Sequence, residues 1–345
     1  MNVPFHFVVP GRLDQATGGY RYVGRIVAAL RNHGRTVIVH ELPGRFPACD
    51  AIARDSARST LEHIPVDEVA IIDGLALPAF YDLLPARAKR VVALIHHPLG
   101  RETGLPPDAA RDWLAREMTA LGKVDGIIVT SRSTADDLRS IGLVRSDLAV
   151  VPPGTDRARA SSRHARGLLC VASLTPRKGH VDLLMALSGL KRHRWRLDCI
   201  GSAERDVAHA RRVRRFIRAF ALGRRVRLLG EVDDGALAYA YRRAGLFVLA
   251  SRHEGYGMAF AEALAHGLPI VGYRAAAVKA TVSCGAGRLV SPGDRRGLRQ
   301  ALRRLMVPTV QAHCAKMARR AARRLGDWRT SADELAAAVD RVVRR

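Results

Sequence analysis

One stretch of the chain decides the fold, and it reads LFVLASRHEGYGMAFAEALAHGLPIV over Leu246–Val271. The apolar run Leu246–Ala250 has the length of a buried strand, and a polar turn with two glycines follows it. A helix comes next and ends near Gly267, and Pro269 marks the start of another strand. Strand, turn, helix and strand in this order predict one unit of a parallel sheet covered by helices.

The same alternation runs along the whole chain, twice over. Short apolar runs predict strands at Phe5–Pro10, Thr36–Leu42, Glu68–Asp73, Arg90–His96, Gly126–Ser131, Leu148–Val151, Leu168–Leu174, Arg196–Gly201, Val226–Gly230, Leu246–Ala250, Pro269–Tyr273 and Arg288–Val290. Helices are expected between them, at about 20–33, 77–86, 107–122, 133–141, 179–190, 204–222, 234–244, 257–266, 295–305 and 310–324. The pattern predicts the α/β class, with two Rossmann-like domains that face a ligand-binding cleft.

The length of the chain also favours two domains, because 345 residues exceed the usual size of one. The stretch Pro152–Gly167 is rich in Pro, Ser, Ala and Arg and has no apolar period, so it is interpreted as a linker. We expect an N-terminal, acceptor-side domain over 1–155 and a C-terminal, donor-side domain over 156–327. A last helix at about 328–345 is free to pack back on the first domain.

Composition excludes several classes of protein. The longest apolar runs are about six residues, far short of the about 20 that span a bilayer. The first ten residues lack a basic region and a long apolar stretch, so we expect no secretory signal and a cytoplasmic protein. The five cysteines are scattered without a C-x-x-C pair, which favours reduced thiols over disulfides or zinc.

The net charge of +25 is concentrated in the second half of the chain. Residues 1–155 hold 18 basic and 17 acidic residues, whereas residues 156–345 hold 39 basic and 15 acidic ones. Such a field attracts nucleic acid, anionic lipid surfaces or phosphorylated ligands. Another interpretation is that the arginine content reflects coding composition.

The turn after the strand at Leu246–Ala250 brings two carboxylates and two glycines together. Glu254 stands at the strand tip, and Glu262 lies inside the helix that follows. Gly255 and Gly257 let backbone N–H groups approach a ligand, and the start of the helix favours phosphate. A carboxylate accepts two hydroxyls of a sugar at once. The pattern predicts a ligand with sugar and phosphate parts; the alternative is a plain turn with surface carboxylates.

This segment resembles the E-x7-E signature of retaining family 4 glycosyltransferases, which have the GT-B fold. The resemblance extends over nearly the whole chain. It implies that Glu254 contacts the donor sugar and that Glu262 contacts the ribose. It also implies that the glycine turn and the helix start hold the diphosphate, through Gly255, Tyr256, Gly257, Met258 and Ala259.

A second segment, Ala172–Gly179, is similar to the strand-to-loop segment that carries the family's phosphate-binding lysine. The resemblance assigns that role to Lys178. The usual arginine of the family is Ser173 here, and Arg177 is expected to replace it. The alternative is that Arg177 and Lys178 are two more solvated cations in a basic half.

Three further segments match the family more weakly. Gly18 and Gly19 open a helix after the first strand and resemble the glycine loop that approaches the donor phosphate. His96 ends a strand and is similar to the family residue near the donor sugar. Arg227–Val232 matches the loop that reads the base, which makes Val232 a donor contact. The alternatives are an ordinary turn and a hydrogen-bonded histidine at a strand end.

The resemblance implies transfer of a sugar, expected to be a hexose, from a UDP- or GDP-linked donor to a hydroxyl acceptor. Glu254, His96 and Lys178 are the expected catalytic residues. Neither a cofactor nor a metal is expected, and the sequence lacks the D-x-D pattern of metal-dependent sugar-nucleotide enzymes. The family's front-face attack needs no carboxylate nucleophile. A sugar-nucleotide epimerase or a phosphorylase on the same fold is the alternative.

The basic half leaves other partners open. The segment Arg211–Arg227 predicts an amphipathic helix, with Val213, Ile217 and two phenylalanines on one side. It would lie on an anionic membrane at the inner face, which suits a lipid-linked acceptor, or pack on the sheet with solvated arginines. A saccharide acceptor is equally open. Low aromatic content and the absence of nucleic-acid-binding motifs argue against a nucleic-acid partner.

Overall fold

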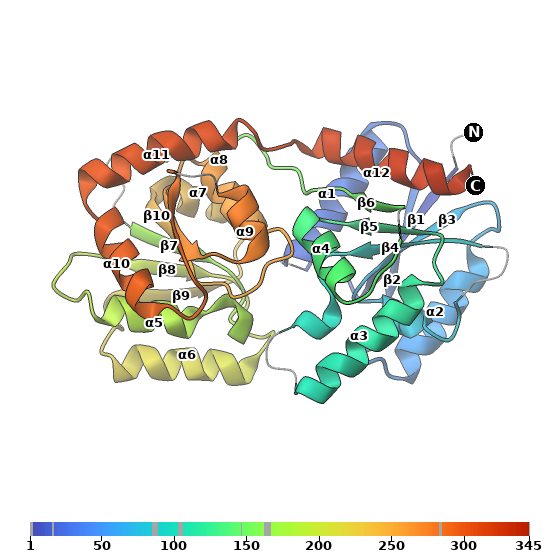
Figure 1. Cartoon of the computed structure of the whole chain (residues 1–345), viewed down its shortest axis with the longest axis horizontal. Helices are drawn as coiled ribbons and strands as arrows, with labels where there is room; N and C mark the ends of the chain where they lie inside the picture. The colour runs from blue at the N-terminus through green and yellow to red at the C-terminus, as the bar shows by residue number, and fades with distance from the viewer. Residues whose placement is uncertain are drawn as a thin grey trace. The chain divides into compact units, whose positions relative to one another are not determined.

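The computed structural model describes residues 3–15, 17–84, 89–102, 106–145, 147–161, 167–282 and 285–344. The chain divides into two compact units. The first unit comprises Met1–Gly154 and Gly326–Arg345, and the second unit comprises Thr155–Leu325. In Figure 1, each unit is a parallel sheet flanked by helices.

The sheet of the first unit has six parallel strands within the described residues, in the order β2-β1-β3-β4-β5-β6. Their bounds are β1 (Phe5–Pro10), β2 (Val37–Leu42), β3 (Val69–Asp73), β4 (Arg90–Ile95), β5 (Gly126–Val129) and β6 (Leu148–Val150). Strands β1 and β3 are buried along their full length. Burial on both faces explains why they are almost continuously apolar, as parallel sheets require.

The helices of the first unit connect these strands. They are α1 (Gly18–Asn32), α2 (Ala51–His63), α3 (Pro107–Leu121) and α4 (Arg132–Ser140), with short 3₁₀ helices at Leu77–Phe80 and Leu99–Arg101. Side chains cap two of the helices: Asp50 accepts from the N–H of Ala53 in α2, and Ser131 accepts from the N–H of Thr134 in α4. These caps satisfy backbone donors that the first helical turn leaves without partners.

The last helix, α12 (Trp328–Val343), belongs to the first unit and packs against α1. Figure 1 shows it in red beside α1. A Cβ atom on Gly126 of β5 would lie 2.6 Å from Cγ2 of Val342, so the helix lies directly on that strand. The Ser331 hydroxyl donates to the carbonyl of Pro152 at 2.7 Å. The end of the chain therefore completes the fold of its first half.

The sheet of the second unit also has six parallel strands in the described part of the chain, in the order β12-β11-β10-β7-β8-β9. Their bounds are β7 (Gly167–Val171), β8 (Leu197–Ile200), β9 (Val226–Gly230), β10 (Ala244–Leu249), β11 (Ile270–Tyr273) and β12 (Gly287–Val290). The helices are α5 (His180–Ser188), α6 (Val207–Ala219), α7 (Asp234–Arg243), α8 (Met258–Ala265), α9 (Ala276–Thr281), α10 (Arg295–Leu305) and α11 (Pro308–Ala322), with a 3₁₀ helix at Pro176–Lys178. This strand order is that of the Rossmann fold.

Each sheet has a point at which the strand order changes direction. In the first unit it lies between β1 and β3, and in the second unit between β7 and β10. The connections that leave two such strands diverge to opposite faces of the sheet. Ligands of open α/β sheets bind in the crevice that this divergence leaves at the carboxyl ends of the strands.

The structure corrects one predicted helix and adds two helices that were not predicted. The helix predicted at 77–86 is only the 3₁₀ helix Leu77–Phe80 followed by a turn, and residues 85–88 lie outside the described part. Proline at position 85 disfavours a helical residue before it, which explains the short element. Helix α2 was not predicted, because its buried stripe consists mainly of Ala53 and Ala57, which give little apolar signal. The short α9 was not predicted either.

The basic segment after β8 forms α6, whose apolar side faces the core of the second unit. Val213 and Ile217 are buried, and Phe216 and Phe220 pack against the same core. The segment was interpreted either as a helix that lies on a membrane or as a helix that packs on the sheet. The burial of its apolar side matches the second interpretation. No helix within the described residues combines the length and the hydrophobicity needed to cross a lipid bilayer.

Candidate functional site

Two neighbouring strands place the predicted donor residues of the second unit together. Lys178 lies in the 3₁₀ helix after β7, and Glu254 lies in the turn after β10. Because β7 and β10 pair in parallel, their carboxyl ends lie at the same edge of the sheet. They also flank the change in strand order, which makes this edge the favoured ligand crevice of the unit.

The centre of this site is an ion pair. Nζ of Lys178 donates to Oε1 of Glu254 at 2.7 Å, and Nη1 of Arg177 lies 3.8 Å from Oε2. All three side chains are largely buried, with exposures of 18% for Lys178, 15% for Arg177 and 8% for Glu254. Two cations on one carboxylate leave this part of the site with a net positive charge.

Opposing effects set the ionisation of Glu254. Burial by itself would raise the pKa of its carboxyl group, because a buried charge loses its hydration. The attraction of Lys178 and Arg177 and the hydrogen bond from Lys178 outweigh that cost and lower the pKa below its ordinary value. Glu254 is therefore a carboxylate at neutral pH and cannot act as a general acid in this state.

Main-chain contacts lock the two loops together. The backbone N–H of Arg252 donates to the carbonyl of Arg177 at 2.8 Å, and Nη1 of Arg177 donates to the carbonyl of His253 at 2.9 Å. The Ser251 hydroxyl also donates to the His253 carbonyl, at 2.9 Å. The ion pair is thus held in place by the backbone of both loops.

Gly179 is required where these loops meet. Its φ of +67° lies in the left-handed region, and a Cβ atom there would lie 1.9 Å from the carbonyl oxygen of Ala250. Only glycine allows this approach. The close packing sets the start of α5 against the end of β10 and so fixes the position of Lys178.

The glycine turn leads directly into α8. Gly257 has a φ of +90° and precedes the first residue of the helix, Met258. Gly255 and Tyr256 lie half-buried in the turn, and Ala259 is the second residue of the helix. The free N–H groups of a helix start and its positive dipole end suit an anionic ligand. This helix start and Glu254 both follow β10.

The second carboxylate of the motif has a partner that the sequence did not predict. The Tyr241 hydroxyl donates to Oε2 of Glu262 at 2.9 Å. The ring of Tyr241 stacks on His266, with ring centres 4.9 Å apart. Tyr241 belongs to α7 and Glu262 to α8. The two residues are far apart in the sequence, so the sequence alone did not predict their contact. The hydrogen bond fixes one oxygen of Glu262, and a carboxylate offers further acceptor positions.

Val232 lies in the connection between β9 and α7, half-buried against the core of the second unit. Strand β9 is separated from β7 by β8. Val232 is therefore at the same edge of the sheet as Lys178, but two strands away.

In the first unit, the predicted residues Gly19 and His96 lie together. A Cβ atom on Gly19 would be 3.3 Å from the imidazole of His96, so the glycine lets the helix approach the ring. Nε2 of His96 lies 2.9 Å from Oδ2 of Asp73, and Tyr22 packs edge-on against the ring. Gly18 is the first residue of α1. Asp73 ends β3, and the sequence analysis did not single it out.

The cysteines carry no disulfide among the described residues, in which Cys49, Cys170, Cys199 and Cys314 are free thiols; Cys284 lies outside them. In the same part of the chain, no three His, Cys, Asp or Glu side chains lie close enough to hold a metal ion. The acidic groups of the site are instead used in pairs with lysine, arginine, histidine and tyrosine.

Comparison with known families gives these sites a context. A model described as Glycosyltransferase Family 4 matches residues 33–159, and one described as Glycosyl transferases group 1 matches residues 165–307. The matches cover 127 and 143 of the 345 residues. Models of two glycosyltransferase families thus match the two halves of the chain. The second match includes Lys178, Glu254 and Glu262.

Curated relatives of this chain are 27% to 30% identical to it over the aligned residues. An MMP α-(1→4)-mannosyltransferase of Mycolicibacterium hassiacum is 27% identical over 286 residues, or 74% of this chain and 66% of that protein. A glycogen synthase of Mycobacterium tuberculosis is 30% identical over 282 residues, or 75% of this chain and 63% of that protein. The chain thus spans somewhat less than two thirds of the length of these relatives.

Solved structures share the GT-B fold. A sucrose-phosphate synthase from Thermosynechococcus elongatus superposes with a TM-score of 0.85 at 20% identity, covering 99% of both chains. Anabaena HepE in complex with UDP-glucose gives a TM-score of 0.80 at 17% identity, covering 98% of this chain and 99% of HepE. The two parallel sheets with flanking helices are therefore the GT-B architecture expected from the sequence.

Proposed function

We propose that the protein transfers a sugar from a nucleoside-diphosphate sugar to a hydroxyl acceptor, with retention at the anomeric carbon and without a metal ion. The observation that carries this proposal is the buried Lys178–Glu254 ion pair at the point where the strand order of the second sheet changes. A carboxylate, two cations and a helix start converge there. These are the groups that a ligand with a sugar and a diphosphate requires.

In this proposal, Lys178 and Arg177 bind the diphosphate of the donor. Departure of a nucleoside diphosphate places negative charge on its terminal phosphate, and fixed cations stabilise that charge as it develops. The N–H groups at the start of α8 contribute in the same sense. The buried position of both cations strengthens the effect, because little water screens them.

Glu254 is proposed to contact the donor sugar as a carboxylate. Its lowered pKa keeps it ionised, so it accepts hydrogen bonds from sugar hydroxyls and does not donate a proton. We assign it no nucleophilic role. The acceptor hydroxyl attacks from the face that the diphosphate leaves, and the departing phosphate oxygen takes its proton.

The remaining donor contacts follow from the family resemblance. Glu262, oriented by Tyr241, accepts from the ribose hydroxyls, and the connection at Val232 contacts the base. Gly18, Gly19 and His96 are assigned to the donor phosphate and the transferring sugar by the same resemblance. The mannosyltransferase among the relatives and the UDP-glucose bound to HepE favour a hexose on a UDP or GDP carrier.

Product analysis tests this function. The protein is incubated with UDP-, GDP- and ADP-hexoses and a panel of saccharide and lipid-linked acceptors, in the presence of EDTA. Transfer yields a free nucleoside diphosphate and an acceptor heavier by one sugar, and NMR of the new linkage reads its anomeric configuration. An epimerized donor without free nucleotide, or a sugar phosphate formed from inorganic phosphate, would instead indicate an epimerase or a phosphorylase.

A further inference from the structure

The acidic residues of the second unit gather at one edge of its sheet. This unit contains 35 Lys or Arg and 11 Asp or Glu residues. Most of the acidic residues follow the carboxyl ends of strands or lie in the next helical turn: Asp182, Glu204, Asp206, Glu231, Asp233, Asp234, Glu254 and Asp294. The connections that lead into β8, β9 and β11, at 189–196, 220–225 and 266–269, contain six Lys or Arg and no acidic residue.

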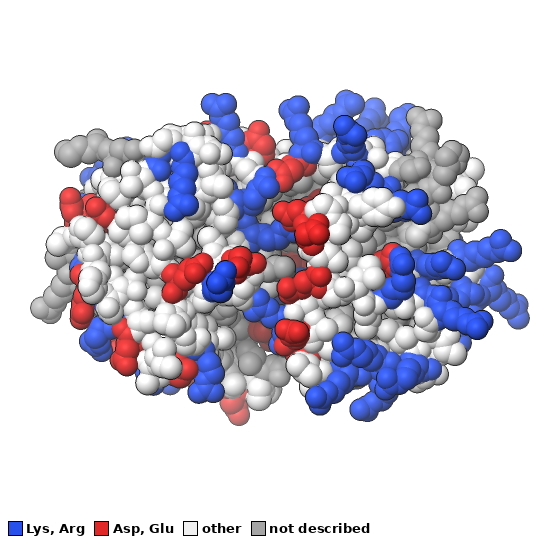
Figure 2. All heavy atoms as spheres, turned by 180° about the vertical axis from the view of Figure 1, so that it is seen from behind, with Lys and Arg blue, Asp and Glu red and all other residues white. Residues whose placement is uncertain are grey.

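Parallel strands place these two groups of connections at opposite edges. The proposed donor site lies at the edge that holds the acidic residues, and the opposite edge is basic. In Figure 2, Lys and Arg side chains gather over the second unit, at the right of the view, whereas both signs are mixed over the first unit. The basic edge therefore attracts anions independently of the donor site.

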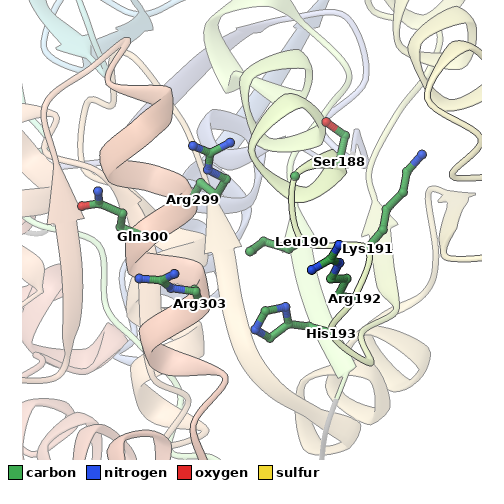
Figure 3. Close-up of a pocket in the computed structure, with 9 residues that line it drawn as sticks. Ser188, Leu190, Lys191, Arg192, His193, Arg299, Gln300 and Arg303 are labelled. Carbon is green, nitrogen blue, oxygen red and sulfur yellow. The ribbon is translucent and has the colours of Figure 1, made fainter.

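A groove opens at this basic edge along α10, which faces the end of α5 on one part of its length and β12 on another. It consists of two adjoining hollows of about 500 and 620 Å³, which share His193, Gln300 and Arg303. Figure 3 shows the first hollow, with Arg299, Gln300 and Arg303 on one side and the turn Ser188–His193 on the other. A Cβ atom on Gly189 would lie 2.8 Å from Cδ of Arg299, so the two walls touch at that point.

The lining of the groove is cationic. Its two hollows are lined by six Lys or Arg and by no Asp or Glu: Lys191, Arg192, Arg288, Arg299, Arg303 and Arg304. All six side chains are exposed, and within the described part of the chain none of them forms an ion pair.

Arg295, one helical turn before Arg299, provides the contrast, because its Nε lies 3.2 Å from Oδ1 of Asp182. Arg295 of α10 is therefore paired with a carboxylate, whereas Arg299, Arg303 and Arg304 form no ion pair within the described residues.

Helix dipoles explain only a small part of this charge. Helices α5 and α10 both end at the groove, and each helix end carries a partial charge of about −0.5. Cations near these ends offset the two partial charges. Six cations exceed about one negative charge by a wide margin. The surplus remains available for a ligand.

We propose that this groove is a second anion-binding site, separate from the donor site, for a small soluble ligand that carries two or more phosphate groups. Guanidinium groups bind phosphate oxygens in pairs, and Arg299 and Arg303 stand one helical turn apart on the same face of α10. The size of each hollow suits a small molecule.

The shape of the groove favours a discrete ligand over a membrane surface. A bilayer is flat on this scale and contacts protruding cations, whereas the two hollows lie between α10 and the segments that face it. Peripheral membrane proteins also insert apolar side chains. Of the residues that line the groove, only Val307 is a large exposed hydrophobic residue.

Calorimetry with inorganic tripolyphosphate tests the site. The groove variant is Arg299→Gln/Arg303→Gln, and the matched control is Arg214→Gln/Arg218→Gln on the exposed side of α6, with the same spacing and the same loss of charge. A third variant, Lys178→Gln, reports any binding at the proposed donor site. Thermal melting of each variant establishes that it is folded, and Arg299→Ala/Arg303→Ala replaces the groove variant if that one does not fold.

We expect tripolyphosphate to bind the wild type and the α6 control within about twofold of each other, and the groove variant at least about tenfold more weakly. The Lys178→Gln variant keeps the component that the groove variant loses. The proposal would be overturned if tripolyphosphate binding were weakened equally in the groove variant and the α6 control. It would also be overturned if binding were lost in Lys178→Gln alone. Binding to phosphatidylglycerol vesicles that needs Arg299 and Arg303, in a protein that does not bind tripolyphosphate, would overturn it as well.

Discussion

Lys178 and Glu254 are 76 residues apart in the sequence, yet Nζ of the lysine lies 2.7 Å from a carboxylate oxygen of the glutamate. The parallel pairing of β7 and β10 brings them together, because each residue follows the carboxyl end of one of these strands. Their burial makes the pair sensitive to the loss of either partner.

Replacing Lys178 by Met leaves the carboxylate of Glu254 buried beside Arg177 alone. We expect the pKa of Glu254 to rise and the free energy of unfolding of the second unit to fall by about 3 kcal/mol. The double variant Lys178→Met/Glu254→Gln removes both charges. Its free energy of unfolding should fall by less than the sum of the losses in the two single variants. Urea denaturation of the four proteins measures this coupling. Strictly additive losses would show that the two side chains do not interact.

Gly179 should not tolerate a side chain. In Gly179→Ala, the new methyl group would meet the carbonyl oxygen of Ala250, and the positive φ adds backbone strain. We expect a loss of about 3 kcal/mol or more in the free energy of unfolding. Gly223→Ala is the matched control, since a Cβ atom at Gly223 has no atom within 4 Å. Similar stabilities of the two variants would contradict the close approach.

Glu117 should make the stability of the first unit depend on pH. It is fully buried, its Oε2 accepts from the N–H of Leu99 at 3.0 Å, and burial raises its pKa to about 8. The unfolded chain ionises this group near its usual value of about 4.3. Between these two values the folded state holds one more proton, so stability falls by about 1.4 kcal/mol per pH unit as the pH rises.

Denaturation of wild type and Glu117→Gln from acid to alkaline pH checks this dependence. Stabilisation by the protonated carboxyl is complete below the unfolded pKa and lost as the pH rises through the folded pKa. The glutamine variant has no ionisable group at this position. Its free energy of unfolding, relative to that of the wild type, should therefore rise with pH between the unfolded and folded pKa values of Glu117. If the difference in free energy of unfolding between the two proteins stays constant with pH, the prediction is wrong.

Asp73 is expected to position His96. Asp73→Asn removes the charge beside Nε2 of His96 but keeps an oxygen for the N–H of Leu75. If His96 acts on the transferring sugar, kcat should fall by about tenfold or more and nucleotide affinity should change by less than about twofold. The pH profile of kcat should shift as well. A variant with unchanged kcat and pH profile would remove His96 from the mechanism.

Much of the fold could be predicted from the sequence, because buried parallel strands are nearly continuous apolar runs. Such runs at Phe5–Pro10 and Leu246–Ala250 correspond to β1 and β10. Helix α2 could not be predicted in the same way, because the alanines on its buried face give only a weak hydrophobic pattern. The order of strands within each sheet depends on tertiary contacts that no local pattern records.

The candidate site shows the same division. The E-x7-E motif and the lysine after β7 could be assigned from their neighbours in sequence. Their partners could not: Tyr241 reaches Glu262 from another helix, and Asp73 reaches His96 from another strand. Tyrosine in a helix and aspartate at a strand end are common, and only the folded chain shows which of them meet a functional residue.

Nucleotide binding in EDTA is the most direct test of the central claim, that the edge of the second sheet at Lys178 and Glu254 binds a nucleotide sugar. Calorimetry compares UDP, GDP and ADP on the wild type, on Glu262→Ala and on Glu204→Ala, an exposed carboxylate of the same unit. We predict that one nucleotide binds the wild type and Glu204→Ala alike and binds Glu262→Ala at least about tenfold more weakly. Binding of none of the three nucleotides, or equal binding to all three proteins, would contradict the account.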